Sequence, residues 1–302
     1  MRGRLPFLGT ALLFLVVQLA ALALAPIFPT EYQAFEDAQD PANPLIYMVL
    51  ILLVTGGVLL LIRLGKQRVI QALFLFSVLV TLFFVSLPLI YLAFPMALAA
   101  LVGAIAVAAF LVGLLLLWPE WYVIDLVGVM VGMGVTAILG MSLGILPALI
   151  LLIILAVYDA ISVYKTKHML TLADSVTPLK LPVLFVVPKR KGFSMKSLEN
   201  KRITQEGEER EALFMGLGDA VIPGVLVVSS FVFLPSASWI QGANLMVALG
   251  TLVGGFAGYL FLMREVAKGK PHAGLPFLNG GAVSGYLISY LLVFQDLGFG
   301  IL

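Results

Sequence analysis

The sequence predicts an all-α integral membrane protein with nine transmembrane helices, and three observations support this fold class. First, the 302-residue chain is 62% hydrophobic and only 11% charged, whereas an average soluble domain is about 45–50% apolar. Second, apolar runs recur that reach the roughly 20 residues needed to cross the hydrocarbon core of a bilayer. Third, all 18 Lys and Arg residues fall on one side of the resulting topology, as expected because cytoplasmic loops collect positive charge.

The nine runs are separated by charges, by Pro and Gly clusters and by polar stretches. We expect the spans at 5–28, 45–62, 69–90, 95–117, 122–140, 145–164, 212–234, 240–263 and 274–294. The division of the uncharged run 69–118 rests mainly on Pro88 and Pro95. The first span resembles a signal peptide, but its apolar run is too long and Pro26 is unfavourable after a cleavage site. We therefore expect the first span to be a retained anchor.

The distribution of charge sets the orientation. Basic residues lie before the first span, between the second and third, after the sixth and after the eighth. The outer loops carry none, and the first of them holds the acidic residues Glu31, Glu36, Asp37 and Asp40. This pattern predicts a cytoplasmic N-terminus and an extracytoplasmic C-terminus. The expected organisation is one membrane domain with spans one to six in 1–165, a cytoplasmic loop at 166–210 and spans seven to nine in 211–302. The expected location is a membrane, and the cell membrane if the source is prokaryotic.

Composition also excludes several function classes. The formal net charge of +2 is too close to neutral to indicate a nucleic-acid partner. Cysteine is absent, so no disulfide, thiolate metal site or cysteine nucleophile is possible. The two histidines, His168 and His272, lack the His-Glu-x-x-His spacing of a zinc protease. Ser284 is 12 residues from His272, about 18 Å along one helix, which is too far for a serine–histidine pair. We expect no metal and no cofactor.

Three acidic residues fall within the predicted spans: Asp125, Asp159 and Asp219. A charge in hydrocarbon costs roughly 2.5–3.5 kcal/mol even on the lenient insertion scale, so such residues are usually functional or paired. At 1.5 Å per residue from Lys165 and Arg210, Asp159 and Asp219 would lie roughly 9 and 13 Å deep. We interpret Asp125, near the start of its span, as a residue that interacts with the positive helix end.

Two carboxyls within reach of each other in a low-dielectric site share one proton, which is the state that an aspartic protease uses. The residues around Asp219 favour this chemistry. Gly216 and Gly218 allow another backbone to approach closely, and Pro223 removes the N–H that would bond to the Asp219 carbonyl, so the helix is weakened there. By contrast, we attribute Gly128/Gly132 and Gly250/Gly254/Gly258 to tight helix packing.

Two other function classes stay open on residue type and depth alone. The first is a proton-coupled transporter or channel that uses the same carboxylates as a relay, with Pro223 and the glycines forming a broken helix. Inverted repeats would favour it, and none is visible in the sequence. The second is a membrane scaffold without enzymatic activity.

Two motifs resemble those of a known family. Tyr158-Asp159 in the sixth span and Gly216-Leu217-Gly218-Asp219 in the seventh are similar to the YD and GxGD motifs of presenilins and signal peptide peptidases. The span count, the orientation and the intervening loop are similar too, and the chain resembles a prokaryotic-type, archaeal presenilin homologue. The resemblance implies an intramembrane aspartyl protease, an aspartic endopeptidase, with Asp159 and Asp219 catalytic and the other motif residues in supporting or substrate-binding roles. It also implies that the enzyme cleaves transmembrane segments of other proteins after local unwinding, without a cofactor.

The family's third motif, Pro-Ala-Leu before the ninth span, departs here. The corresponding stretch reads Ala273-Gly274-Leu275-Pro276, and it keeps only Leu275 and the following Pro276, which we assign to substrate binding or support by resemblance. The change concerns substrate preference more than chemistry. Residue types alone make the apolar run 181–187 either an interfacial segment or a strand. The resemblance suggests that it is a strand that pairs with an extended substrate. Prokaryotic-type relatives work alone, so no obligatory partner is implied, and a homo-oligomer is compatible with this.

Overall fold

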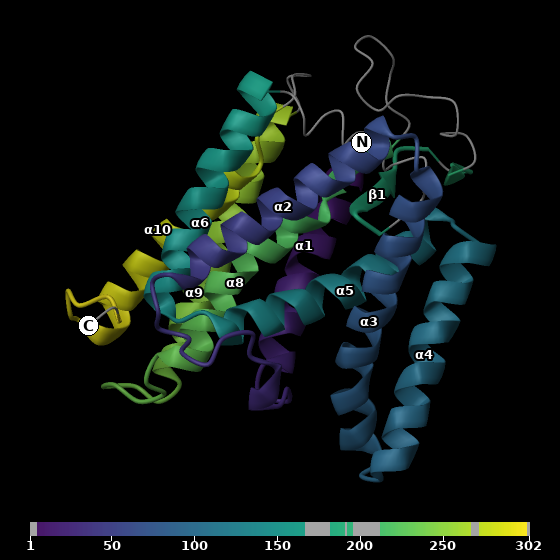
Figure 1. Ribbon diagram of the computed structural model, residues 1–302. Helices are drawn as coiled ribbons and strands as arrows, with labels where there is room; N and C mark the ends of the chain where they lie inside the picture. Colours follow the sequence, from purple (N-terminus) through teal and green to yellow (C-terminus); the bar gives the residue numbers. More distant parts are fainter. Residues whose placement is uncertain (1–4, 167–181, 191, 196–211, 267–271, 301–302) are drawn as a thin grey trace. The chain divides into compact units, whose positions relative to one another are not determined.

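The computed structural model describes residues 5–166, 182–190, 192–195, 212–266 and 272–300 (Figure 1). Within these residues the chain is mostly helical. Its elements are α1 (Leu5–Leu24), η1 (Thr30–Tyr32), α2 (Asn43–Arg63), α3 (Gln67–Ala93), α4 (Ala97–Leu117), α5 (Trp121–Ser142), α6 (Ile145–Ile161), the π-helical turn η2 (Ser162–Thr166), β1 (Leu184–Pro188), β2 (Ala212–Gly216), α8 (Leu217–Phe233), α9 (Ala243–Val266) and α10 (Leu275–Phe294).

Every predicted span overlaps one of these α-helices. Eight of the described helices are long and apolar enough to cross a membrane, and α8 is a shorter apolar helix. Each long run of uncharged residues forms a helix because a helix satisfies all of its backbone polar groups internally, which hydrocarbon requires. The membrane class predicted from composition is confirmed.

The predicted seventh span is wrong at its start. Residues 212–216 form β2, which pairs antiparallel with β1 in the register Leu184↔Gly216 to Pro188↔Ala212. The helix therefore begins at Leu217, five residues later than predicted. Most of the predicted cytoplasmic loop 166–210, including its Glu-rich end at 206–211, lies outside the described residues.

The chain divides into two compact units, and each is described by itself. The first contains residues 5–13, 53–134 and the described part of 168–217. In this unit α3 and α4 pack side by side, and Gly103 of α4 lets Ile90 of α3 approach to van der Waals distance. The strand β1 also belongs here, and its Phe185 and Val186 are buried.

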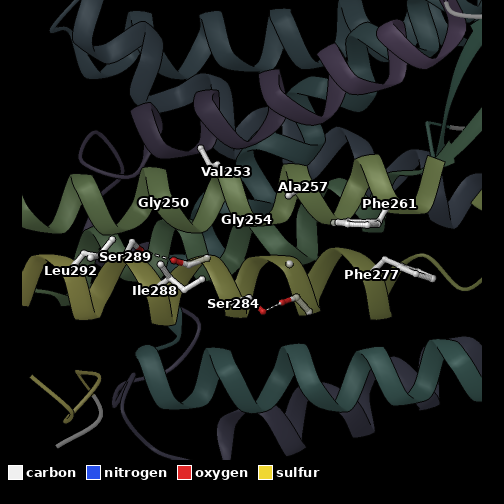
Figure 2. A pocket seen from close by; sticks show the side chains of 14 residues that line it. Gly250, Val253, Gly254, Ala257, Phe261, Phe277, Ser284, Ile288, Ser289 and Leu292 are labelled. Carbon is white, nitrogen blue, oxygen red and sulfur yellow. Dashed lines mark hydrogen bonds between the residues drawn. The ribbon is translucent and has the colours of Figure 1, made fainter. Parts of the chain in front are cut away.

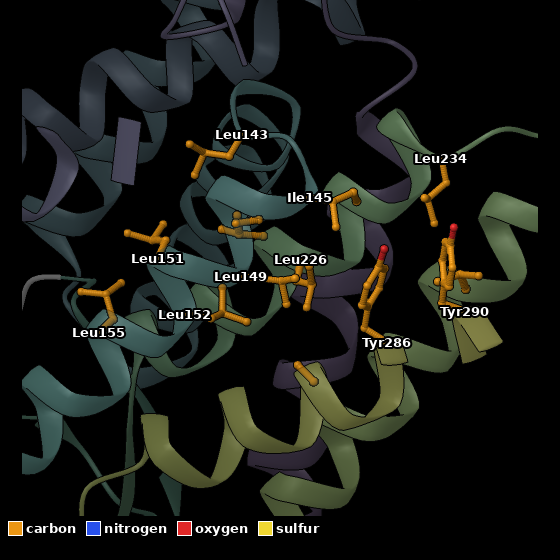
Figure 3. Packing of buried hydrophobic residues seen from close by; sticks show 14 of the residues in the cluster. Leu143, Ile145, Leu149, Leu151, Leu152, Leu155, Leu226, Leu234, Tyr286 and Tyr290 are labelled. Atoms are coloured by element: carbon orange, nitrogen blue, oxygen red, sulfur yellow. The ribbon is translucent and has the colours of Figure 1, made fainter. Parts of the chain in front are cut away.

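The second unit contains residues 14–52, 135–166 and 218–300. Its core is formed mainly by α6, α8 and α10 with residues from the start of α9, and Figure 3 shows side chains of this cluster. Buried residues of this core include Leu149, Leu152, Leu226, Tyr286 and Tyr290. The core fixes the relative positions of α6, α8 and α10, which carry the polar side chains of Asp159, Asp219 and Asn279.

The helices α9 and α10 meet along a seam of glycines, as the spacing of Gly250, Gly254 and Gly258 predicts. A Cβ at Gly254 would lie 2.6 Å from the Gly285 Cα, and a Cβ at Gly258 would lie 2.9 Å from the Phe277 carbonyl carbon. The two backbones are therefore in contact, which small residues permit in membranes. An apolar groove follows this seam, with Val253, Ala257, Phe261, Ile288 and Leu292 along it (Figure 2).

Replacing Gly258 by Ala should destabilise the protein, because the new methyl group meets backbone atoms of Phe277 that no rotamer change can move. We expect a loss of about 1–3 kcal/mol, typical of overpacking, measured as a lower midpoint of thermal unfolding in detergent. The control is Gly113→Ala in α4, where a Cβ meets nothing within 4 Å. It should be neutral or stabilising by up to about 1 kcal/mol. Equal effects of the two changes would contradict the close contact of α9 and α10.

Candidate active site

Asp159 lies near the end of α6 and is buried, with 4% of its side chain exposed. It follows Leu152 and Leu155, which are buried in the core of the second unit, at the spacing of one helix face. The π-helical turn η2 begins three residues later, and such turns often occur at functional sites. The helix therefore directs a carboxyl group into an apolar interior.

The start of α10 supplies the hydrogen-bond donor for this carboxyl group. The backbone N–H of Leu275 donates to Asp159 Oδ2 at 3.0 Å, and the backbone of Gly274 makes a second hydrogen bond to it. The first N–H groups of a helix have no partner within the helix, so a carboxylate is a natural acceptor there. Pro276 sits in the first turn, where its missing N–H costs nothing.

Two further hydrogen bonds join α10 and the segment before it to α6 and η2. Asn279 Nδ2 donates to the Leu152 carbonyl at 2.8 Å, and Ala273 N–H donates to the Tyr164 hydroxyl at 3.3 Å. Both Asn279 and Ala273 are buried. The segment that enters α10 is thus fixed to α6 on both sides of Asp159.

Asp219 lies in the first turn of α8, which follows directly from the strand at 212–216. Its carboxyl group packs against Gly274, where an ideal Cβ would be 3.0 Å from Oδ1 and 3.2 Å from Cγ and Oδ2. This space is filled by the carboxyl because residue 274 has no side chain. The two aspartates thus contact the same dipeptide, Gly274-Leu275.

The helix beyond Asp219 is supported from α1. Pro223 interrupts the hydrogen bonding of α8 because it has no N–H. Nearby, Gln18 Nε2 donates to the Ala220 carbonyl at 3.3 Å, and Gln18 is fully buried. A Cβ on Gly224 would lie 2.7 Å from the Thr136 Cγ2, so α5 also approaches closely here. Contacts from α1 and α5 therefore support the turn of α8 that Pro223 weakens.

The structure brings together some of the residues predicted from the sequence. Asp159, Asp219 and Leu275 meet around Gly274. Tyr158 is half-buried beside Asp159, Gly216 and Leu217 form the junction between β2 and α8, and Gly218 is exposed. Gly274 itself, and the support from Ala273, were not among the predicted site residues. The signal was present, since Gly274 occupies the middle position of the altered third motif.

The interpretation of Asp125 as a residue of the helix start is wrong. Its carboxyl is buried, with 6% of the side chain exposed, and Oδ1 accepts a hydrogen bond at 2.8 Å from the N–H of Val186 in β1. Gly128 is likewise packed against a strand residue, with the Phe185 ring 3.0 Å from its ideal Cβ. Contacts with β1 explain both positions, in place of the helix end predicted for Asp125 and the helix packing predicted for Gly128.

The strand predicted within 181–187 exists as β1. The prediction was that it pairs with a substrate, but one edge of β1 pairs with β2 and the other is bound at Val186 by Asp125. Leu217 N–H donates to the Val183 carbonyl at 3.0 Å, so residues 183, 185 and 187 face β2 in the antiparallel ladder. Val186 then faces outward, where Asp125 binds it. By the same alternation, Phe214, opposite Val186, directs its N–H and C=O to the outer edge of β2.

The apolar groove along α9 and α10 is a separate feature, because neither aspartate lines it. Within the described ranges, no group of three or more His, Cys, Asp or Glu residues is arranged as metal ligands. The described residues around Gly274 offer two carboxyl groups and backbone donors.

Comparison with known proteins agrees with this geometry. The family model for signal-peptide peptidase and presenilin aspartyl protease matches residues 11–295. Two solved structures of a presenilin family intramembrane aspartate protease are similar, one in space group C222 (TM-score 0.70, 37% identity, covering 95% of this chain and all of that chain), and one in P2 (TM-score 0.67, 38% identity, covering 95% and 98%).

No curated protein matches the chain. These matches are to proteases, and they give the transporter hypothesis no support. The eight long apolar helices among the described residues, together with these membrane-protease relatives, show that the chain is a multi-pass membrane protein. The chain belongs to the signal peptide peptidase and presenilin family of intramembrane aspartyl proteases, which are hydrolases acting on peptide bonds.

Proposed function

We propose that Asp159 and Asp219 are the catalytic pair of this protease and that it hydrolyses peptide bonds within transmembrane segments of other membrane proteins. The observation that carries the proposal is the contact of both carboxyl groups with Gly274-Leu275. A common neighbour places the two carboxyls near each other, and this supports their joint action on one substrate bond. Asp159 is buried and Asp219 is half-buried, and a low-dielectric site strengthens electrostatic interactions with a reacting group.

In the proposed reaction the two carboxyl groups share one proton. The ionised carboxyl takes a proton from a water molecule, whose oxygen bonds to the carbonyl carbon of the scissile peptide. The protonated carboxyl donates a hydrogen bond and then its proton to the carbonyl oxygen as negative charge develops there. When the C–N bond breaks, the nitrogen leaves as an amine after receiving a proton from one carboxyl. The other carboxyl takes a proton from a hydroxyl of the intermediate as the product carboxyl group forms, so the pair again holds one proton.

The residues around the pair have distinct supporting roles in this proposal. Leu275 N–H orients the Asp159 carboxyl. Gly274 leaves space for Asp219. Pro276 lies in the first turn of α10, where a backbone N–H would have no partner within the helix. We assign Tyr158, and Gly216, Leu217 and Gly218 at the junction of β2 and α8, to support and substrate contact.

A transmembrane substrate must lose its helix before cleavage, because helical hydrogen bonds shield its peptide groups. We propose that the unwound segment adds to the outer edge of β2, a common mode of peptide recognition. The outer edge of β1 is occupied at Val186 by Asp125. Phe214 offers both of its backbone polar groups at the opposite edge, and β2 ends three residues before Asp219.

We further propose that α8 crosses the membrane with the eight longer helices, so that nine spans run from a cytoplasmic N-terminus to an extracytoplasmic C-terminus. The apolar composition of α8 supports its membrane location. The placement of all 18 basic residues in the cytoplasmic loops of this topology supports the orientation. Asp159 and Asp219 would then both lie in the cytoplasmic half.

Replacing either catalytic carboxyl by an amide should abolish cleavage. Asn keeps the shape of Asp159 and an acceptor for Leu275 N–H, but it neither holds nor transfers the shared proton. We expect Asp159→Asn and Asp219→Asn each to lower kcat at least about 100-fold. The measurement uses purified protein in lipid with a transmembrane peptide, and mass spectrometry identifies the products.

The control for this experiment is Glu36→Gln, an exposed carboxyl of the first outer loop, which should cleave at the wild-type rate. Thermal unfolding of all variants tests that they fold. Wild-type cleavage by either Asn variant would reject the pair, and ion flux that depends on the two aspartates without any cleavage would favour a transporter.

Bulk at position 274 should impair cleavage in proportion to its size. The Cβ of Gly274→Ala would press on the Asp219 carboxyl at 3.0 Å, which a small shift relieves, whereas Gly274→Val must displace the carboxyl. We expect a loss below about tenfold for Ala and above about 100-fold for Val. Gly280→Val on the same helix, where a Cβ meets nothing within 4 Å, should retain activity. If Val were tolerated at position 274, the contact with Asp219 would not matter for catalysis.

A proline at position 214 should weaken substrate binding without breaking the strand pair. The Phe214 N–H faces away from β1, and proline is accepted at such edge positions. Phe214→Pro should raise KM more than Phe214→Ala does, because both lose the ring and only Pro loses the outward N–H. Steady-state kinetics with the transmembrane peptide compares them. The same KM for both variants would argue against strand addition at β2.

A further inference from the structure

Asp125 is a buried carboxyl group that the proposed cleavage reaction does not use. It lies on α5 inside a membrane-spanning helix, with 6% of its side chain exposed. A carboxyl at such a position needs a partner, and its partner is the Val186 N–H of β1, 61 residues away in sequence. The hydrogen bond therefore joins a membrane helix to a strand outside the helical core.

The surroundings of this bond are shaped to receive β1. Gly128, one turn further along α5, leaves room for the ring of Phe185, which an ideal Cβ would approach to 3.0 Å. On α1, Gly9 leaves room for Val187, whose Cγ1 would be 2.6 Å from a Cβ. The residues on both sides of Val186 thus enter spaces that glycine leaves open. The strand is docked by shape as well as by the carboxyl.

The chain after β1 is held by a second carboxyl at the start of the same helix. Glu120 accepts hydrogen bonds from the Ser194 hydroxyl at 2.8 Å and from Met195 N–H at 3.4 Å. Met195 is buried. The first turns of α5 therefore fasten the strand and the segment that follows it.

We propose that Asp125 is a positioning residue for cleavage: by binding Val186 N–H it holds β1 against α5, blocks the outer edge of β1, and so fixes the strand pair on which the substrate is aligned. This inference rests on the proposed function. In this proposal the register in which a substrate pairs with β2 selects the peptide bond that is cleaved, because β2 is continuous in sequence with the turn that carries Asp219. Loss of the anchor affects KM and the cleavage position more than kcat.

The test compares Asp125→Ala with Asp125→Asn in the full-length protein in lipid nanodiscs. Ala leaves the Val186 N–H without an acceptor, whereas Asn keeps an oxygen that accepts the bond. For Ala we expect amide hydrogen exchange in 183–190 to rise at least about tenfold, KM to rise about tenfold with kcat within about threefold, and additional cleavage sites to appear in mass spectra. Asn should stay within about threefold of wild type in every measurement.

A second variant addresses the case in which Asp125→Ala does not fold. Gly128→Val displaces Phe185 without touching Asp125 and should reproduce the faster exchange and the higher KM. A folded Ala variant with unchanged exchange, or with unchanged KM and cleavage positions, overturns the proposal, as does an Asn variant that is as impaired as Ala. If the wild type does not cleave, the proposed protease function fails, while the exchange measurement still decides whether Asp125 holds β1.

Discussion

The hydrogen bond from the Leu275 N–H to Asp159 is the interaction on which the candidate site depends. It fixes the carboxyl of α6 against the first turn of α10, and the adjoining Gly274 then receives the carboxyl of Asp219. Asn279 and Tyr164 reinforce this joint on either side. A single helix start thus positions two carboxyls that the chain carries on different helices, and this arrangement uses backbone donors that every helix start leaves unpaired.

Much of the fold could be predicted because hydrocarbon imposes a simple rule on sequence. Long uncharged runs become helices, and α3 and α4 separate at Pro95 as predicted, although Pro88 lies inside α3. The aspartates and the glycine seam of α9 and α10 could be predicted for a related reason, since a carboxyl in lipid and a regular spacing of small residues are both rare without a purpose.

The parts that sequence reasoning missed all depend on contacts between distant segments. Residues 212–216 are apolar and adjoin a helix, and a short apolar run does not distinguish strand from helix by itself. Pairing with β1 decides the outcome. That strand also invalidates the predicted depth of Asp219, because the helical rise was counted through five residues that are extended. Asp125 was misjudged in the same way, since its acceptor role exists only once β1 is in place.

The glycine seam between α9 and α10 has a mechanical consequence for the site. Because the two backbones touch with no side chains to repack between them, the pair tilts as one rigid body. Tilt is the ordinary response of a helix to a bilayer that is thinner or thicker than its apolar length. Because the core and the Leu275–Asp159 hydrogen bond also hold α10 to α6, such a tilt would load the joint that carries the Asp159 carboxyl. The thickness of the surrounding bilayer would then act on the site through the same contacts that hold it together.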